Sequence, residues 1–239
     1  MTDETAKAKH PASASRHLPT SNCSTNRRRF LQSLTLAGAA LAVDGPRAWA
    51  DVVKLPSAVP QGGLPVMEAL AKRQSIRAFS DRALPQQTLA NILWAAFGIN
   101  RPASGDHTAP SWRGSKETDV YVATAEGVWL FEPKTNELRS VMTADIRDKT
   151  SSMVFAATAP VVLIYVADTA RMAPASPEEH RLYAHVDAAM IGQNVYLYAA
   201  ATGLGTVILG SVDRAALAKT LNLAAGKIVT FSQPIGFPQ

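Results

Sequence analysis

A single long helix, predicted from Pro177 to about Thr202, constrains the fold of this chain more than any other feature. Its start is marked by Ser176-Pro177-Glu178-Glu179, which supplies a capping serine, a proline in the first turn and a glutamate three residues after the serine. Its end is marked by Gly203. Between Val186 and Ala201 the sequence is apolar almost all round the helix, so we expect this helix to be buried on every side.

Strand patterns predict a sheet that can cover this helix. Residues 160–167, PVVLIYVA, form an unbroken run rich in β-branched side chains, which is typical of a strand buried on both faces. Residues 119–125 and 128–132 are predicted to form a hairpin around Glu126-Gly127. Further strands are expected at 138–142, 206–209 and 227–235, and further helices at 65–73, 84–97 and 213–221. Strands and helices in this order predict an α+β fold with a mixed sheet layer.

Two segments lack the periodicity of a helix or a strand. Residues 51–63 contain Pro56, Pro60 and Gly62-Gly63, and we interpret them as a linker or an extended arm. Residues 100–116 are rich in proline and glycine and are predicted to form a loop of about seventeen residues. Structureless loops of that length are usually functional or mobile, so this loop is a candidate part of a site.

The composition fits one globular domain that is close to neutral. The chain has 239 residues, of which 47% are apolar and 18% charged, enough for a full core. Residues 1–50 hold seven basic and three acidic side chains, so they carry most of the net charge of +5. The nearly neutral remainder argues against nucleic acid binding. Cys23 is the sole cysteine, which leaves the rest of the chain without a disulfide, a thiolate metal site or a cysteine nucleophile.

The first fifty residues have the pattern of a cleaved export signal. A basic segment, NRRRFLQ at residues 26–32, precedes an apolar run at residues 33–43, and Ala48-Trp49-Ala50 fits a small-residue cleavage site. Arg27-Arg28 followed by Phe30-Leu31 resembles the twin-arginine signal, which is an address and not an anchor. That route exports folded proteins, often with a cofactor already inserted, so the resemblance implies a periplasmic protein. The alternative is a retained membrane anchor, for which the apolar run is short.

A basic segment follows the first predicted helix of the body. In AKRQSIRAFS, residues 71–80, Arg73 and Arg77 flank Ser75. Two guanidiniums and a hydroxyl suit a phosphate monoester, because arginine donates hydrogen bonds in pairs to anionic oxygens. All three side chains converge if the helix ends near Arg73 and the chain then becomes extended. The alternative is an ordinary solvated helix end, with arginine near the helix C-terminus.

No other residues in the body form a recognisable catalytic or metal-binding group. His180 and His185 are five residues apart and do not share a helical face, so we interpret them, with His107, as surface or hydrogen-bonded structural histidines. Asp187 and Gln193-Asn194 lie in the apolar helix, and we expect them to form internal hydrogen bonds. Because no nucleophile and base stand together, the reactive atom of an enzyme of this kind would belong to a bound cofactor. We predict no metal site.

Several sequence motifs, in this order and spacing, resemble the nitroreductase family. The resemblance covers residues 64–238 and implies an FMN-dependent α+β homodimer with a mainly antiparallel sheet. Residues 64–239 are accordingly the expected FMN-binding domain, after a signal peptide at residues 1–50 and the arm at residues 51–63. The motifs are KRQSIRAFSDRALP (72–85), ILWAAFGINRP (92–102), TAPS (108–111), DVYVATAEGVWLF (119–131), GQNVYLYAAATGLGTVILG (192–210) and PIGFP (234–238).

The resemblance also assigns roles to three segments. The basic segment would hold the flavin phosphate and ribityl chain, the serine loop would border the flavin ring, and the turn after the long helix would offer backbone N–H groups to the N5 and O4 edge of the flavin. The residues concerned are Arg73, Gln74, Ser75, Ile76 and Arg77 in the first segment, Ser111, Trp112 and Arg113 in the second, and Ile208, Leu209 and Gly210 in the third.

Two features depart from the family pattern. Family members commonly place a basic residue near the C-terminus against the phosphate, but this sequence has no Lys or Arg after Lys227. Charge neutralisation then falls on Arg73, Arg77 and Arg113. The serine loop has Trp112 near the position where an asparagine often contacts the flavin. One interpretation is that Trp112 stacks on the flavin ring or lines the substrate slot. The other is that it anchors the loop by packing on the core.

The resemblance implies an exported, homodimeric FMN oxidoreductase that transfers two electrons through flavin N5. Its substrate would be a flat conjugated compound such as a nitroaromatic or a quinone. Family members usually use NADH or NADPH, which the periplasm is not expected to supply, so a quinol, a redox partner protein or an organic substrate stays open as the electron donor. The alternatives are a flavin-binding protein of the same fold without turnover, and a cofactor-free interaction module that dimerises through the long helix.

Overall fold

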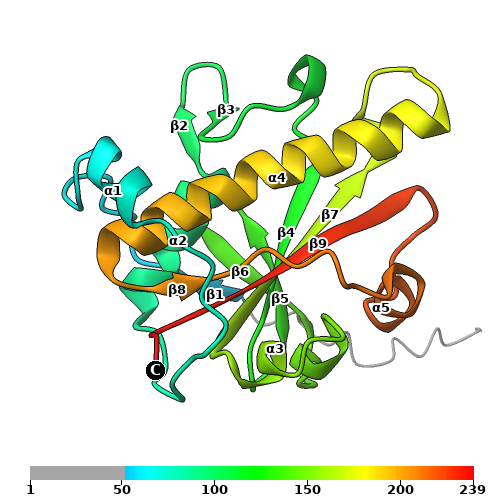
Figure 1. Ribbon diagram of the computed structural model, residues 1–239. Coiled ribbons are helices and arrows are strands. Elements are labelled where there is room, and N and C mark those ends of the chain that lie inside the picture. The colour runs from blue at the N-terminus through cyan, green and yellow to red at the C-terminus, as the bar shows by residue number, and fades with distance from the viewer. Residues whose placement is uncertain (1–51) are drawn as a thin grey trace, which may run out of the picture. The chain divides into compact units, whose positions relative to one another are not determined.

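The computed structural model describes residues 52–239, so the predicted export signal lies outside the described residues. The described chain forms a seven-stranded sheet in which every neighbouring pair of strands is antiparallel, with helices on both faces (Figure 1). The strand order is β1-β6-β5-β4-β7-β9-β8. The predicted α+β class, with a mainly antiparallel sheet flanked by helices, is confirmed.

The elements lie close to the predicted ones. The strands of the main sheet are β1 (Val52–Lys54), β4 (Thr118–Ala123), β5 (Val128–Glu132), β6 (Glu137–Met142), β7 (Val161–Asp168), β8 (Gly205–Thr206) and β9 (Lys227–Gly236). A separate ribbon pairs β2 (Ile99–Arg101) with β3 (Asp106–His107). The helices are α1 (Val66–Lys72), α2 (Gln86–Phe97), α3 (Phe155–Thr158), α4 (Pro177–Thr202) and α5 (Arg214–Thr220), with 3₁₀ turns η1 (Trp112–Gly114), η2 (Arg147–Lys149) and η3 (Thr169–Arg171).

Strand β7 lies between the two cores of the molecule, as its unbroken apolar sequence predicts. Val161, Leu163 and Tyr165 belong to a core that also contains residues of α2 and α4. The alternate residues Val162 and Ile164 belong to a second core, which includes residues of α5. Because successive side chains of a strand point to opposite faces, a strand covered on both sides is apolar at every position.

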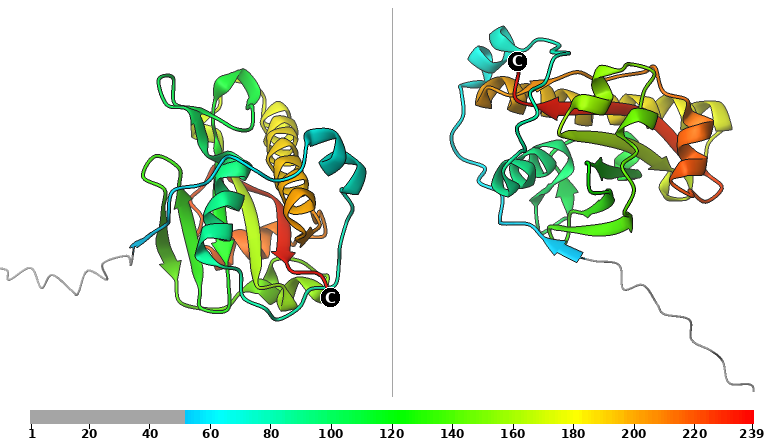
Figure 2. Two further views of the ribbon diagram at one scale, coloured as in Figure 1. Left: turned by 90° about the vertical axis from the view of Figure 1, so that its left-hand side faces the viewer. Right: turned by 90° about the horizontal axis from the view of Figure 1, so that it is seen from below.

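Helix α4 runs across one face of the sheet (Figures 1 and 2). The predicted capping box is present, since the Ser176 side chain accepts a hydrogen bond from the Glu179 N–H, and Gly203 ends the helix with φ +73°. A Cβ on Gly192 would lie 2.7 Å from Ile208 Cδ1 and 3.1 Å from Gln233 Oε1. Glycine at that position therefore lets the helix approach the end of the sheet closely.

The expectation that α4 is buried on every side is wrong for the single chain. Within the apolar stretch Ala188, Ile191 and Val195 are buried, but Ala189 is exposed and Met190 is 41% exposed. The helix is therefore a core element along one side and an apolar surface along the other. The sequence did not separate these two sides, because both carry apolar residues.

The segment 51–63, expected to be a linker or an extended arm, begins within the sheet. β1 pairs with β6, Leu55 is 4% exposed, and its N–H donates to the Asn136 carbonyl oxygen at 3.1 Å. Farther along, the Val59 N–H donates to Asn91 Oδ1 on α2 at 2.8 Å. The arm is thus attached to both the sheet edge and α2.

The segment 100–116, predicted to be a structureless loop, contains ordered elements. It starts in the β2–β3 ribbon, which projects from the sheet in Figure 1, and ends in the turn η1. Buried His107 fixes the ribbon, since its ring stacks on Phe97 with centroids 4.1 Å apart and its Nδ1 lies 2.6 Å from the Phe97 carbonyl oxygen. None of the helices described here is long and apolar enough to cross a membrane.

Candidate functional site

The basic segment leaves α1 in an extended conformation. α1 ends at Lys72, and Arg73 has φ −59° and ψ 123°, outside the helical region. The Ile76 N–H donates to the Thr206 carbonyl oxygen at 3.0 Å, which attaches the segment to β8. A Cβ on Gly205 would lie 2.7 Å from Ile76 Cγ2, so glycine there makes room for this contact. The sequence allowed either an extended segment after Arg73 or an ordinary solvated helix end, and the structure shows the extended segment.

A cavity of about 480 Å³ lies against this segment, at the C-terminal end of α4. That volume is within the usual range for small-molecule sites. Arg73, Gln74 and Ile76 line the cavity, whereas Ser75 and Arg77 do not. The other lining residues are Ala71, Lys72, Tyr196, Ala199, Ala200, Gly203, Leu204, Thr206 and Pro238. The structure therefore brings part of the predicted phosphate group into one cavity and adds a second cation, Lys72.

Tyr196 connects the basic segment to the turn after α4. Its hydroxyl accepts a hydrogen bond from the Ile208 N–H at 2.9 Å and lies 3.0 Å from Ser75 Oγ. The Arg73 guanidinium lies over the tyrosine ring, 5.3 Å from its centroid. Since the Tyr196 side chain is almost fully buried, this hydroxyl fixes the position of two predicted site segments at once.

The turn at residues 208–210 offers fewer free amides than the sequence suggests. The Ile208 N–H is bonded to Tyr196, and the Leu209 N–H donates to the Ser232 carbonyl oxygen at 2.8 Å. The Gly210 N–H forms no hydrogen bond within residues 52–239. Gly210 is also exposed, so among the three it is the amide that can bind a ligand without breaking an existing bond.

The serine loop is anchored on α4. Ser111 Oγ accepts a hydrogen bond from the Lys116 N–H at 2.9 Å, and the Trp112 N–H donates to Asp187 Oδ2 at 2.6 Å. The Trp112 ring stacks on Tyr183 with centroids 4.5 Å apart and an interplanar angle of 11°. The exposed Arg113 guanidinium lies 4.5 Å from the Trp112 ring centroid. In this structure Trp112 therefore anchors the loop. This agrees with the second interpretation of the sequence, in which Trp112 packs on the core.

Two buried carboxyl groups lie beneath this loop. Asp187 is 3% exposed and Glu117 is fully buried, and their side chains are in hydrogen-bonding contact. Glu117 also accepts a hydrogen bond from Ser115 Oγ at 2.6 Å. Burial raises the pKa of Asp187 to about 7, and Glu117 adds to this shift, although the Trp112 N–H opposes it. The expectation that Asp187 forms internal hydrogen bonds is confirmed.

The two site regions lie at different positions along α4. The basic segment contacts Tyr196, whereas the serine loop contacts Asp187, nine residues earlier, which corresponds to about 14 Å of helix. None of the serine-loop residues 111–113 lines the cavity at the basic segment. Within one chain, the structure therefore places these two predicted parts of the site separately.

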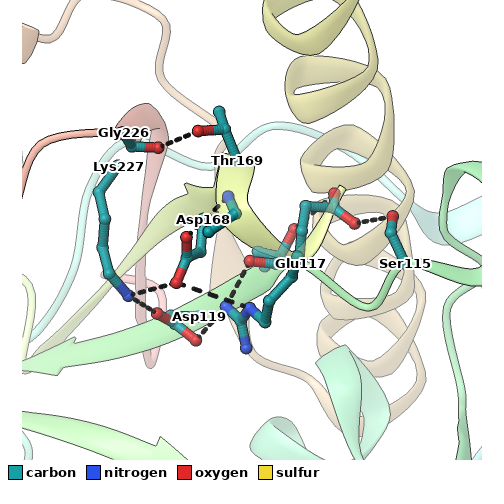
Figure 3. Close-up of polar contacts among 10 residues, drawn as sticks. Ser115, Glu117, Asp119, Asp168, Thr169, Gly226 and Lys227 are labelled. Atoms are coloured by element: carbon teal, nitrogen blue, oxygen red, sulfur yellow. Dashed lines mark hydrogen bonds and ion pairs between the residues drawn. The ribbon is translucent and has the colours of Figure 1, made fainter. Parts of the chain in front are cut away.

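Lys227 cannot take the place of a basic residue at the C-terminal end. It belongs to an ion-pair network in which its Nζ lies 2.7 Å from Asp119 Oδ2 and 3.3 Å from Asp168 Oδ2 (Figure 3). Arg171 pairs with the other oxygen of Asp119, Oδ1. Lys227 starts β9, whereas Pro238 at the cavity follows its last residue, so about 30 Å of strand separate them.

The histidines of the described chain have structural partners, as predicted. His107 contacts the Phe97 carbonyl oxygen, His180 the Ala173 carbonyl oxygen and His185 the Arg181 carbonyl oxygen. Residues 52–239 contain no group of three or more His, Cys, Asp or Glu side chains arranged to hold a metal ion.

Comparisons with known proteins decide the family. The family model described as "Nitroreductase family" matches residues 70–237, most of the chain. This chain belongs to the nitroreductase family. A solved Ralstonia eutropha JMP134 protein, described as a nitroreductase, shares 35% identity and a TM-score of 0.75 over 79% of this chain and 90% of that one. A Methanocaldococcus jannaschii protein with the same description is 29% identical over 154 residues, 60% of this chain and 77% of its own.

The nitroreductase fold recurs in a structure that contains a flavin. A Desulfovibrio desulfuricans protein, described as a nitroreductase in complex with FMN, has a TM-score of 0.54 and 24% identity over 73% of this chain and 87% of its own. At that identity the likeness concerns the fold alone.

Three residues at the nitroreductase cavity were missed by the sequence analysis. Lys72 lies within the basic segment, but the sequence assigns it no role at the site. Tyr196 lies in an apolar run, where its hydroxyl carried no recognisable pattern. Thr206 is fixed by a hydrogen bond from its Oγ1 to the Pro234 carbonyl oxygen at 2.8 Å. Of the three, only Lys72 had a sequence signal, because it is a basic residue directly before Arg73.

Proposed function

We propose that this protein is an FMN-dependent oxidoreductase that transfers two electrons to or from a flat conjugated molecule such as a nitroaromatic or a quinone. The observation that carries the proposal is the cavity at the basic segment. It is lined by the cations Arg73 and Lys72, and Tyr196 joins its wall to the turn that holds the free Gly210 amide. Family membership supports the same chemistry.

The donor set at this cavity fits a flavin mononucleotide. Arg73 and Lys72 would neutralise the phosphate, and the Gln74 N–H would add a hydrogen bond to it, whereas Ser75 lies outside the cavity lining and the Ile76 N–H is already bonded to Thr206. Gly210 would donate its N–H to the flavin ring. When bound, FMN supplies the two-electron chemistry at its N5 atom. The protein's contribution is to orient the cofactor and to provide fixed donors.

We also propose that two copies of the chain form a homodimer. Apolar side chains are exposed on α1 and along α4, with Met67 74% exposed, Val66 63% and Leu182 56%. Serine loop and basic segment contact α4 about 14 Å apart within one chain. A second copy whose α4 runs antiparallel would bring its serine loop toward this chain's basic segment. Arg113 and Ser111 would then border the flavin of the other copy.

The direct test is a visible spectrum of the full chain after incubation with FMN and removal of the excess. We expect flavin absorbance to stay with the protein, and a bound flavin that NADH, NADPH or a quinol reduces. Stopped-flow mixing with each donor in turn identifies which one acts. Protein that retains no flavin under these conditions would contradict the proposal.

For localisation, we propose export to the periplasm by the twin-arginine route. The support is the sequence of residues 1–50. Replacing Arg27-Arg28 with Lys-Lys should leave the precursor in the cytoplasm of a bacterium that has this route, whereas the wild-type chain is recovered from the periplasm. Equal periplasmic recovery of both would contradict this assignment.

A flavin-binding protein without turnover is the second candidate function. It is favoured by the turn after α4, where two of the three amides expected to face the flavin are bonded within the protein. FMN that binds tightly but is reduced by none of the three donors would support this candidate over the enzyme.

A further inference from the structure

We propose that Asp187 and Glu117 are positioning residues of the flavin site, and that as a pair sharing one proton they hold the serine loop against α4. The effect of the pair on FMN binding rests on the proposed function, since that function assigns the serine loop to the flavin site. The physical basis of the inference is independent of FMN, because it concerns two buried carboxyl groups and the loop attached to them.

Both carboxyl groups are attached to the same loop. Asp187 accepts the Trp112 N–H at 2.6 Å, and Glu117 accepts the Ser115 hydroxyl at 2.6 Å (Figure 3 shows the second contact). The Ser115 hydroxyl also lies 2.7 Å from the Trp112 carbonyl oxygen. The two carboxyl groups therefore bind the first residue of the turn η1 and the residue that follows its last one. The Trp112 ring also packs on Tyr183.

The surroundings of the pair explain why it holds a proton. Among the described residues, no Lys, Arg or His side chain forms a salt bridge with either carboxyl group. Arg171 donates to the backbone oxygen of Glu117, not to its carboxylate. The titratable and charged side chains on the elements around the pair are Arg113 and Lys116 on the loop, Asp119 on β4, Arg171 on η3, and His180, Tyr183 and His185 on α4.

Two cations of this group, Lys116 and Arg171, are engaged elsewhere. Lys116 pairs with Asp106 at 2.9 Å, and Arg171 pairs with Asp119 at 2.5 Å. Two carboxylates in contact in a buried, uncompensated position cannot both be ionised at little cost, so one proton stays between them. That proton makes the contact an attraction between the carboxyl groups and not a repulsion.

The sign of the pH dependence follows from this arrangement. Burial and Glu117 raise the pKa of Asp187 to about 7, above the value of an unfolded chain. The stabilisation is therefore complete only below the pKa of an aspartate in the unfolded chain, about 4, and is lost progressively as the pH rises from there through about 7. Above that pH the pair carries two charges, which repel each other beneath the loop, and the loop is expected to loosen.

The test measures hydrogen exchange of residues 108–116 at pH 6 and pH 8, corrected for the intrinsic rate, in the full chain without FMN. We expect wild-type protection to fall roughly tenfold between these values, because one pH unit above the pKa changes the protonated fraction about tenfold. Asp187→Asn keeps an oxygen for the Trp112 N–H and cannot lose a proton, so its protection should change little. Glu117→Gln removes the neighbouring carboxylate but leaves buried Asp187 able to titrate, so its protection should fall less than that of the wild type but more than that of Asp187→Asn.

Glu178→Gln is the matched control, because it removes one carboxylate from an exposed position of the same helix. It should keep the wild-type pH dependence. Equal protection of the wild-type loop at both pH values, or an unchanged pH dependence in both Asp187→Asn and Glu117→Gln, would overturn the proposal.

The consequence for the site is tested separately by FMN titration at pH 6 and pH 8. We expect the wild-type protein to lose affinity at pH 8 and Asp187→Asn to lose much less. If no variant binds FMN at either pH, the proposed function fails while the exchange measurement still decides the role of the pair. If FMN binds with the same pH dependence in both proteins, the pair does not position the site.

Discussion

At the scale of single residues, the site depends on hydroxyl and carboxyl groups inside an apolar helix. Tyr196 and Asp187 each join α4 to a segment far away in the sequence, Tyr196 to Ser75 and Ile208, and Asp187 to Trp112. A buried polar side chain needs a partner, and here the partners are the segments that the sequence assigns to the cofactor. Polar positions in α4 therefore determine where those segments lie.

Tyr196→Phe tests this at one atom. The change removes the acceptor of the Ile208 N–H, and leaving a donor without a partner is expected to cost about 1–3 kcal/mol of the free energy of unfolding. Urea denaturation of the protein without FMN measures this loss. Tyr198→Phe is the control, because the Tyr198 hydroxyl has no hydrogen bond within residues 52–239. Equal stability of the two variants would show that the Tyr196 hydroxyl does not hold the turn.

The sequence predicted the kinds of residues at the site better than their partners. Arg73 at the end of α1 was found because two arginines flank a serine, a local pattern that survives without knowledge of the fold. The bonds of Tyr196 and Asp187 join positions up to 121 residues apart. Such contacts depend on how the elements pack, and no spacing in the sequence encodes them.

At the scale of elements, the arm before α1 is part of the domain. β1 completes one edge of the sheet, and Asn136 Nδ2 donates to the carbonyl oxygens of Leu55 and Pro56 at 3.3 and 2.9 Å. The prolines and glycines of the arm predict an irregular segment, which is correct for residues 55–63. They do not predict the short strand β1 that comes before them. Strands of three residues have too little periodicity to be recognised.

Leu55→Ala measures how much the arm contributes. Leu55 is 4% exposed and belongs to the core beside α2, so its truncation should cost about 2–5 kcal/mol of the free energy of unfolding. Val52→Ala, at a position that is 55% exposed in the same arm, should change little. A Leu55→Ala variant as stable as the wild type would mean that the arm does not contribute to the stability of the domain.

At the scale of the whole molecule, the exposed apolar residues of α1 and α4 are the strongest indication of a second copy. The two helices pack together (Figure 1), and both carry exposed apolar side chains. Large exposed apolar patches on soluble proteins mark interaction sites. The long helix was expected to be buried on every side, and a dimer would restore that burial.

Sedimentation velocity tests the dimer. The wild-type chain should sediment as a dimer, and Met67→Asp together with Met190→Asp should shift it to a monomer, because each places a charge in the apolar interface. Val59→Asp, at a position that is 52% exposed and on the arm, should leave the dimer intact. A wild-type chain that sediments as a monomer at micromolar concentration would contradict this part of the account.

We propose above all that Arg73 binds the phosphate of FMN in the cavity at the end of α1. Isothermal titration of the wild-type protein and of Arg73→Ala with FMN measures this contact, with Arg82→Ala as control, since Arg82 is exposed and its guanidinium lies 4.0 Å from the Phe237 ring centroid. Arg73→Ala should weaken FMN binding by about 1.5–3 kcal/mol, the value of a charged hydrogen bond, and Arg82→Ala should bind FMN like the wild type. Unchanged affinity in Arg73→Ala would contradict the proposal.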